Sequence, residues 1–173
     1  IILLDEPLAN LDVHLRAEMI EVFAQLHRDT GATIVFVTHD QAEALALADR
    51  VIVLDRGLVQ QSGPPEQLYG EPANAMVAGF VGRGSLVAAT GAEGRVWLSG
   101  VALPARGVMQ DGNLRLLLRP EGLALAETGI PAQVVGSRYA GSGYDATLRF
   151  AGGDTALLNA RQRLDIGQPV HVA

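Results

Sequence analysis

Two adjacent carboxylates near the start of the chain, Asp5 and Glu6, are the first residues that could do chemistry. Their negative charges repel each other, so the pair needs a cation or a hydrogen-bonded water beside it. Asn10, Asp12 and His39 follow at short range and could join them. A lone Asp-Glu pair is more often a charged turn that ends a strand, so the surrounding elements must decide between the two interpretations.

The residues around the pair predict that it lies at the edge of a sheet. The apolar run Ile1–Leu4 is typical of a parallel strand buried on both faces, with the start of a buried helix as the alternative. Pro7 biases Glu6 toward an extended backbone. Open α/β sheets bind their ligands at the carboxyl ends of the strands, which is where Asp5 and Glu6 would lie.

A helix and a second strand come next. Asp12 is a suitable N-cap residue, apolar residues recur at helical spacing after it, and Gly31 suits the left-handed position beyond the helix end. The β-branched run Thr33–Val37 predicts a central strand that leads to His39.

Further helices and strands continue the alternation. Asp40 and Glu43 predict a capping box for a helix over Gln41–Ala48. Two strands and two short helices are then expected at 50–54, 58–61, 64–69 and 74–81. Strands that alternate with helices predict an α/β domain with a doubly wound sheet.

The sequence changes character near Gly82. Short apolar runs alternate with glycine-containing turns, which predicts an all-β domain, either a small barrel or a sandwich. Its strands are expected at 86–89, 95–98, 101–104, 114–119, 132–139, 144–150, 155–158 and 170–172.

The two predicted strand ends carry motifs that resemble those of an ABC-transporter ATPase. Asp5-Glu6-Pro7 is similar to the Walker B segment, Ala9–Asp12 to the D-loop and His39 to the switch histidine, in the order and spacing of that family. Residues 1–82 therefore resemble the C-terminal half of a P-loop NTPase domain.

The later part of the chain resembles a TOBE domain, an OB-like accessory β-barrel found in many binding-protein-dependent importers. Leu118–Glu121 and the segment from Gly136 onward carry this resemblance. It implies a TOBE-like accessory domain over residues 83–173.

The resemblance implies a role for each candidate site residue. Asp5 would hold Mg²⁺ through a bound water, and Glu6 would orient and deprotonate the water that attacks the γ-phosphate of ATP. His39 would sense the γ-phosphate by hydrogen bonding. Asn10 and Asp12 would report across a dimer of ATPase domains. Asp12 as a plain N-cap is the alternative, and both roles can hold.

Other polar residues have simpler interpretations. Arg119 and Glu121 are expected to form a structural clamp, with contact to a neighbouring subunit as the alternative. The glycine-rich turn between Tyr139 and Tyr144 is expected to be a hairpin tip rather than a ligand site. The remaining histidines are expected to be surface or packing residues: His14, His27 and His171.

The chain contains no lysine. A P-loop needs a glycine-rich loop closed by a Lys that reaches the phosphates, and no such segment is found. The family's Leu-Ser-Gly-Gly-Gln segment is also missing. Both precede Walker B in this family, so we expect a piece of a longer protein that alone neither binds ATP tightly nor hydrolyses it.

Composition and charge exclude several classes of protein. There is no cysteine, so disulfides and thiolate metal sites are excluded. No apolar run reaches the ~20 residues of a membrane span. Residues 1–80 carry 4 Arg against 12 acidic residues, and residues 81–173 carry 9 Arg against 7. Without a basic stripe, and with Trp97 as the one tryptophan, an OB-type nucleic-acid binder is disfavoured.

The resemblance as a whole implies the ATP-hydrolysing subunit of an ABC importer, at the cytoplasmic face of the inner membrane. Its expected partners are the membrane permease subunits, a second copy of the ATPase subunit and, indirectly, a periplasmic solute-binding protein. The segments Thr38–Gly63 and Phe80–Gly84 look most like the ferric-iron and polyamine group. A sugar, sulfate or other oxyanion importer is the alternative, as is a barrel that binds a ligand or regulator.

Overall fold

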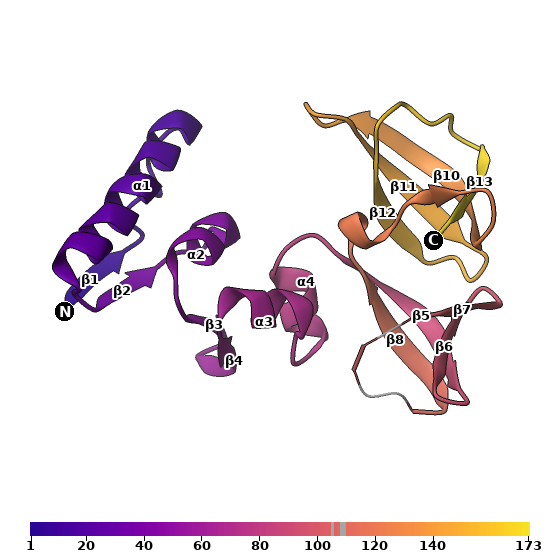
Figure 1. Ribbon diagram of the computed structural model, residues 1–173, viewed down its shortest axis with the longest axis horizontal. Coiled ribbons are helices and arrows are strands. Elements are labelled where there is room, and N and C mark those ends of the chain that lie inside the picture. Colours follow the sequence, from indigo (N-terminus) through magenta and orange to yellow (C-terminus); the bar gives the residue numbers. More distant parts are fainter. Residues whose placement is uncertain (105, 108–109) are drawn as a thin grey trace. The chain divides into compact units, whose positions relative to one another are not determined.

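The computed structural model describes residues 1–104, 106–107 and 110–173 (Figure 1). The chain forms two compact units, Ile1–Val77 and Ala78–Ala173, and each is described by itself below.

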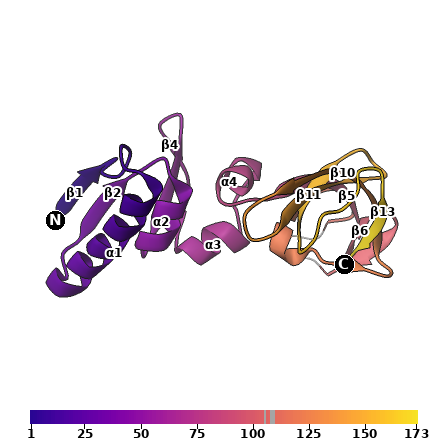
Figure 2. The same ribbon diagram turned by 90° about the horizontal axis from the view of Figure 1, so that it is seen from above.

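The first unit begins with a strand, a helix and a second strand (Figure 2). β1 (Ile2–Asp5) and β2 (Ile34–Val37) pair in parallel, so their carboxyl ends lie at the same edge. α1 (Val13–Thr30) connects them and packs on one face of the pair. Phe23 of α1 meets Phe36 of β2 edge to face there, with ring centroids 5.8 Å apart.

The prediction that the first strand is buried on both faces is wrong. Leu3 is 74% exposed, and the side chains of Val35 and Val37 are exposed as well. These three side chains lie on the face of the strand pair that points away from α1. Among the described residues of this unit, no element covers that face. An apolar run predicts that a strand can be covered on both sides, but the second covering element must come from another part of the tertiary structure.

β3 (Val51–Asp55) and β4 (Leu58–Gly63) form a separate antiparallel hairpin. Its two turn residues, Arg56 and Gly57, have φ values of +48° and +77°, as a type I′ turn requires. Two two-stranded sheets thus replace the single doubly wound sheet that was predicted. Alternating elements indicate which segments are strands, whereas the order of strands depends on pairing that the alternation does not specify.

Two short helices, α2 (Gln41–Leu47) and α3 (Pro65–Gly70), complete the first unit, and a third, α4 (Ala75–Phe80), begins in it and ends in the second. They lie where the sequence predicts helices. Pro65 begins α3, where its fixed φ and missing N–H fit the first turn. No helix among the described residues is both long enough and apolar enough to cross a membrane.

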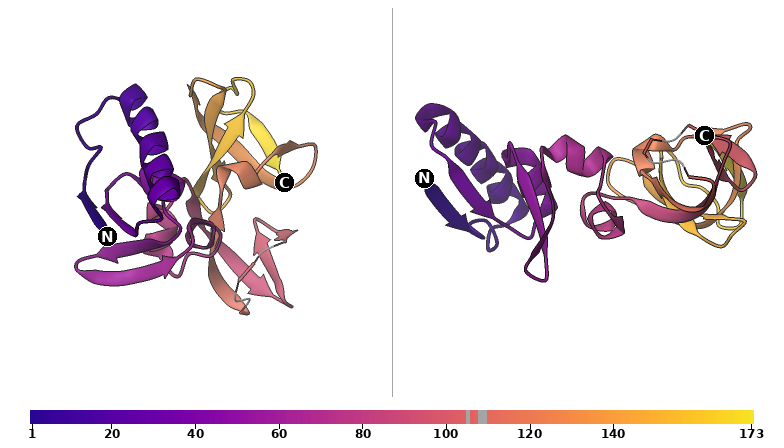
Figure 3. Two further views of the ribbon diagram at one scale, coloured as in Figure 1. Left: turned by 60° about the vertical axis from the view of Figure 1, so that its left-hand side comes forward. Right: turned by 90° about the horizontal axis from the view of Figure 1, so that it is seen from below.

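The second unit consists of two antiparallel sheets (Figure 3). The four-stranded sheet has the order β7-β6-β5-β8, and the five-stranded sheet has the order β12-β11-β10-β13-β9. The strands of the first sheet are β5 (Ser85–Ala92), β6 (Arg95–Leu98), β7 (Val101–Leu103) and β8 (Gly112–Leu118). The second sheet follows a 3₁₀ turn, η1 (Pro120–Gly122), with β9 (Leu125–Ala126), β10 (Ile130–Tyr139), β11 (Tyr144–Phe150), β12 (Thr155–Ala160) and β13 (Pro169–Val172).

Apolar side chains from both sheets pack into one core, which includes Val87, Leu98, Leu118, Val134, Leu148, Phe150, Leu158 and Val172. The predicted change to β structure is confirmed, with strand ends that differ from the predicted ones by a few residues. β9 was not predicted, because a two-residue strand is too short to show a period.

Candidate functional site

The parallel pairing of β1 and β2 brings the predicted site residues to one edge. Asp5 lies opposite Val37 in the register, and the N–H of Glu6 donates to the Val37 carbonyl at 2.8 Å. The turn after β1 and the Thr38-His39 turn after β2 therefore face each other. This is the arrangement expected from the carboxyl ends of parallel strands.

The backbone at Glu6 differs from the prediction. Its φ is +44°, in the left-handed region, rather than extended as Pro7 was expected to make it. The turn is held on both sides, because the Glu6 N–H is bonded to β2 and the Glu6 carbonyl accepts from Ala9 N–H at 3.2 Å. Such a conformation costs a side-chain-bearing residue on the order of 1–3 kcal/mol, so it persists only where surrounding bonds such as these hold it.

The side chains of Glu6 and His39 meet at this edge. Glu6 Oε2 lies 3.4 Å from His39 Nδ1, and the two side chains are 50% and 73% exposed. The two side chains lie next to each other and both face solvent. The carboxylate and the imidazole can therefore contact the same water, or the same oxygen of an incoming ligand.

Asp5 is exposed beside this pair. Among the described residues no group of three or more His, Asp or Glu side chains could hold a metal by itself. Mg²⁺ does not need such a cage, since one or two carboxylates with waters and substrate phosphates are its usual ligands in proteins. The carboxylates present therefore fit Mg²⁺ that arrives with a phosphate ligand.

Asn10 and Asp12 lie on the exposed loop between β1 and α1. The N–H groups of His14 and Leu15 donate to Asp12 Oδ1 at 3.0 and 2.9 Å, so the predicted N-cap is confirmed. The loop is anchored by Leu8, which is fully buried. Asn10 and the free edge of Asp12 remain accessible to a partner molecule.

Sequence reasoning missed a polar network behind the His39 turn. Arg16 of α1 donates to Asp40 Oδ2 at 2.9 Å, and its Nε lies 3.5 Å from Glu43 Oε1. Thr38 Oγ1 donates to Glu43 Oε2 at 2.6 Å. The sequence carries no signal that pairs Arg16 with a residue 24 positions away.

The predicted capping box is half right. Asp40 Oδ1 accepts from the N–H groups of Ala42 and Glu43, as an N-cap should. The Glu43 carboxylate does not return to the Asp40 N–H, which donates to Thr38 Oγ1 at 2.9 Å instead. Glu43 instead accepts from Thr38 Oγ1 and lies beside the partly buried Arg16, whose positive charge stabilises the carboxylate.

Arg119 in the second unit has a structural role. Its Nη1 donates to the carbonyls of Val81 and Arg83, at 2.8 and 3.2 Å. These bonds attach the segment before β5 to the end of β8. The turn between Tyr139 and Tyr144 is a hairpin tip, as predicted, with the two rings paired across the strands at 5.4 Å.

Asp145 of β11 is a buried carboxylate held by two arginines. Arg83 Nη2 lies 2.7 Å from its Oδ2, and Arg138 Nη2 lies 3.3 Å from the same atom. The hydrogen bond from Arg83 lowers the pKa of Asp145 below its ordinary value, with help from Arg138 and against the opposing effect of burial. This cluster joins the segment before β5 to the β10–β11 hairpin.

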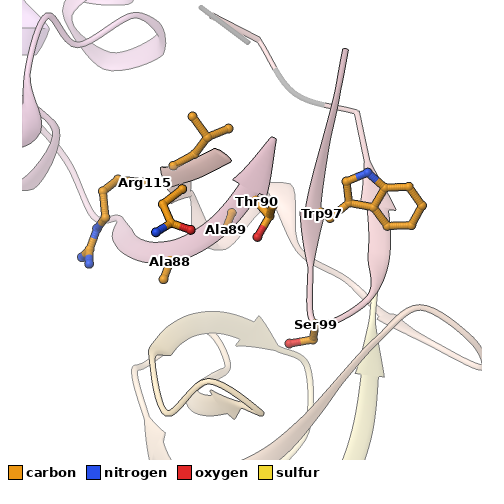
Figure 4. A pocket seen from close by; sticks show the side chains of 8 residues that line it. Ala88, Ala89, Thr90, Trp97, Ser99 and Arg115 are labelled. Carbon is orange, nitrogen blue, oxygen red and sulfur yellow. The ribbon is translucent and has the colours of Figure 1, made fainter. Parts of the chain in front are cut away.

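A shallow hollow of about 440 Å³ lies on the exposed face of the four-stranded sheet (Figure 4). Its lining includes Thr90, Trp97, Asn113 and Arg115, which come from three neighbouring strands. None of the predicted site residues contributes to it, and Arg115 is engaged with the Leu86 carbonyl at 2.8 Å. The hollow is therefore separate from the strand-end site.

The chain is similar to known proteins over nearly all of its length. A family model described as TOBE domain matches residues 116–173, which contain η1 and β9 to β13. The uncharacterized ABC transporter ATP-binding protein y4oS of Sinorhizobium fredii is 41% identical over 96% of this chain and 47% of the relative.

Two further relatives have named transport roles. The sn-glycerol-3-phosphate import ATP-binding protein UgpC of Paracoccus denitrificans is 46% identical over 74% of this chain and 37% of its own length. The Fe(3+) ions import ATP-binding protein FbpC of Escherichia coli is 35% identical over 99% of this chain and 51% of its own length. The chain spans about half the length, or less, of these curated relatives.

Proposed function

We propose that this chain, which belongs to the ABC-transporter ATP-binding family, is the C-terminal part of a subunit that hydrolyses ATP to drive import. Residues 1–82 are the second half of its ATPase domain, and residues 83–173 are its TOBE-like accessory domain, an OB-like barrel. The observation that carries the proposal is the pairing of Glu6 and His39, at 3.4 Å, beside Asp5 at the ends of two parallel strands.

Each residue of this edge has a distinct role. Glu6 orients the attacking water and accepts its proton, and His39 donates to or accepts from the same water or a phosphate oxygen. Asp5 would hold Mg²⁺, which when bound would neutralise charge on the phosphates. Phosphoryl transfer depends mainly on positioning and electrostatic stabilisation, so a carboxylate and an imidazole fixed by paired strands are sufficient on this side of the nucleotide.

Asn10 and Asp12 report the state of this site to a second copy of the subunit. The exposed loop that carries them, anchored by the buried Leu8, supports this role. The N-cap bonds of Asp12 use Oδ1, so its other oxygen can contact a partner without loss of the cap.

The proposed partners and cargo are those of an importer of this family. ATP-binding subunits of importers act with membrane permease subunits at the cytoplasmic face of the inner membrane, and indirectly with a periplasmic solute-binding protein. Relatives that are 46%, 37% and 35% identical to this chain are named for sn-glycerol-3-phosphate, sulfate/thiosulfate and Fe(3+) import, respectively. Ferric iron or a polyamine is the proposed cargo, with a sugar, sulfate or another oxyanion as the alternative.

The test is Glu6→Gln in the full-length protein. Glutamine keeps the size and hydrogen bonds of glutamate but cannot accept the proton, so ATP turnover should fall by about 10²–10⁴-fold. ATP binding should survive, and ATP should hold two subunits together as a dimer that gel filtration detects.

Glu21→Gln is the matched control, because it makes the same chemical change at an exposed position of α1. Its turnover should equal that of the wild type. Near wild-type turnover in Glu6→Gln would remove Glu6 from the mechanism and return the Asp-Glu pair to a charged turn.

A further inference from the structure

We propose that Arg16 is a positioning residue that couples the Asn10–Asp12 loop to the His39 turn. The inference rests on the proposed function and assigns to Arg16 a part in it. Arg16 acts through other residues, since it lies on α1 behind the strand-end site rather than at its exposed edge.

The first step is the contact of Arg16 with both loops at once. Its Nη2 donates to the carbonyl of Leu11 at 3.3 Å, and Leu11 lies between Asn10 and Asp12. Its Nη1 donates to Asp40 Oδ2 at 2.9 Å, and Asp40 directly follows His39. One rigid guanidinium therefore fixes the distance between the two loops, which a flexible lysine could not do.

The second step concerns the hydrogen bonds that hold the two neighbours of His39, Thr38 and Asp40. Thr38 donates to Glu43 at 2.6 Å and accepts from the Asp40 N–H at 2.9 Å. Both neighbours of His39 are thus tied to the network that contains Arg16, whereas the His39 side chain itself is exposed. The backbone of His39 has little freedom while these bonds hold.

The third step is burial. The Glu43 side chain is 4% exposed, against 29% for Arg16. A carboxylate that is buried this deeply needs a cation and hydrogen bonds, and Arg16 supplies the cation. Loss of Arg16 leaves the Glu43 charge uncompensated, so the Thr38 contact and the position of His39 must shift with it.

Arg16→Gln and Asp40→Asn in the full-length protein test the proposal. Both should lower kcat for ATP, by up to about 100-fold, because a displacement of about 1 Å at a catalytic group has that effect. KM for ATP should stay within about 2-fold, since a positioning role through Leu11 and Asp40 affects the catalytic step rather than binding. Asp40→Asn would still offer a side-chain oxygen in place of the Asp40 Oδ1 that caps α2, so it is the variant expected to fold if Arg16→Gln does not.

The distinguishing measurement is non-additivity with His39. In a His39→Ala background, Arg16→Gln should lower kcat by less than about 2-fold further, because residues that act as a unit are not additive. Arg28→Gln is the matched control on the same helix, where Arg28 contacts Gln25 at the exposed surface. It should behave as wild type.

The outcomes separate this inference from the proposed function. If the wild type hydrolyses ATP, His39→Ala is impaired and both network variants keep wild-type kcat, the coupling role is wrong and the ATPase assignment stands. Full additivity of the effects of Arg16→Gln and His39→Ala on kcat would also overturn the coupling role, because additivity is what a general loss of stability would produce. If His39→Ala and Glu6→Gln both keep wild-type turnover, the proposed function itself fails.

Discussion

His39 Nδ1 lies 3.4 Å from Glu6 Oε2, across the edge at which β1 and β2 end. The two residues are far apart in the sequence, and the parallel register of the strands brings them together. The pair should therefore act as one unit in ATP hydrolysis.

The first prediction concerns this unit. His39→Ala in the full-length protein should lower kcat by about 10²-fold, since the water and phosphate lose one contact that positions them. The kcat of the double variant Glu6→Gln/His39→Ala should lie within a few-fold of the kcat of Glu6→Gln alone. Steady-state kinetics measures both, with the exposed His14→Ala as control. Independent, multiplying losses would contradict the paired role.

The second prediction separates Asp5 from Glu6. Asp5→Asn removes a charge that favours Mg²⁺, so it should weaken binding of Mg-ATP, whereas Glu6→Gln should leave that affinity unchanged. Titration calorimetry with ATP in the presence and absence of Mg²⁺ measures the difference. Equal metal dependence in Asp5→Asn and the wild type would exclude Asp5 as the metal-holding residue.

The third prediction divides the two roles of Asp12. Asp12→Ala should destabilise the first unit by about 1 kcal/mol, because the N–H groups of His14 and Leu15 lose their acceptor. Asp12→Asn restores that acceptor and should restore the stability, as a urea midpoint would show. If Asp12 also contacts a second subunit, Asp12→Asn should still reduce ATP-dependent dimerisation; full dimerisation would leave Asp12 as a cap alone.

The fourth prediction concerns the stability of the two units in this chain. The helix α1 has no fully buried residue, and the apolar side chains of Leu3, Val35 and Ile52 are exposed. The second unit has a continuous core. Amides of residues 1–59 should exchange with deuterium early and amides of residues 114–150 late. Equal protection in a monomer would mean that the bare face of the first unit has found another cover.

The fifth prediction is the pH dependence of Asp145. Because folding lowers its pKa, the folded state binds fewer protons than the unfolded state in the acid range. The stabilisation is complete above the ordinary Asp value of about 3.9 and is lost as the pH falls from there through the lowered folded-state pKa.

Asp145→Asn should therefore lower the free energy of unfolding by about 1–2 kcal/mol at pH 7, allowing for the exposure of both arginines. The difference from the wild type should shrink once the pH falls below about 4. Urea midpoints measured against pH provide the test. A constant difference down to about pH 2 would contradict the ionic role and leave only packing.

Both ends of α1 could be predicted because their causes are local. Asp12 caps α1, and Gly31, with φ +59°, ends it. The periods of apolar residues predicted strands such as β11, whose bounds the prediction matched. The backbone of Glu6 was predicted wrongly, since bonds to the Val37 carbonyl and from the Ala9 amide outweigh the local bias of Pro7.

By itself the sequence determined the residue types at the strand ends, the caps and the order of elements, because these depend on neighbours within a few positions. Only the tertiary structure decided which distant groups meet. Arg16 reaches Asp40 across 24 residues, and Arg83, which precedes β5, reaches Asp145 in β11. Such pairs depend on how whole elements pack, and a charged side chain looks the same in sequence whether it faces water or a buried carboxylate.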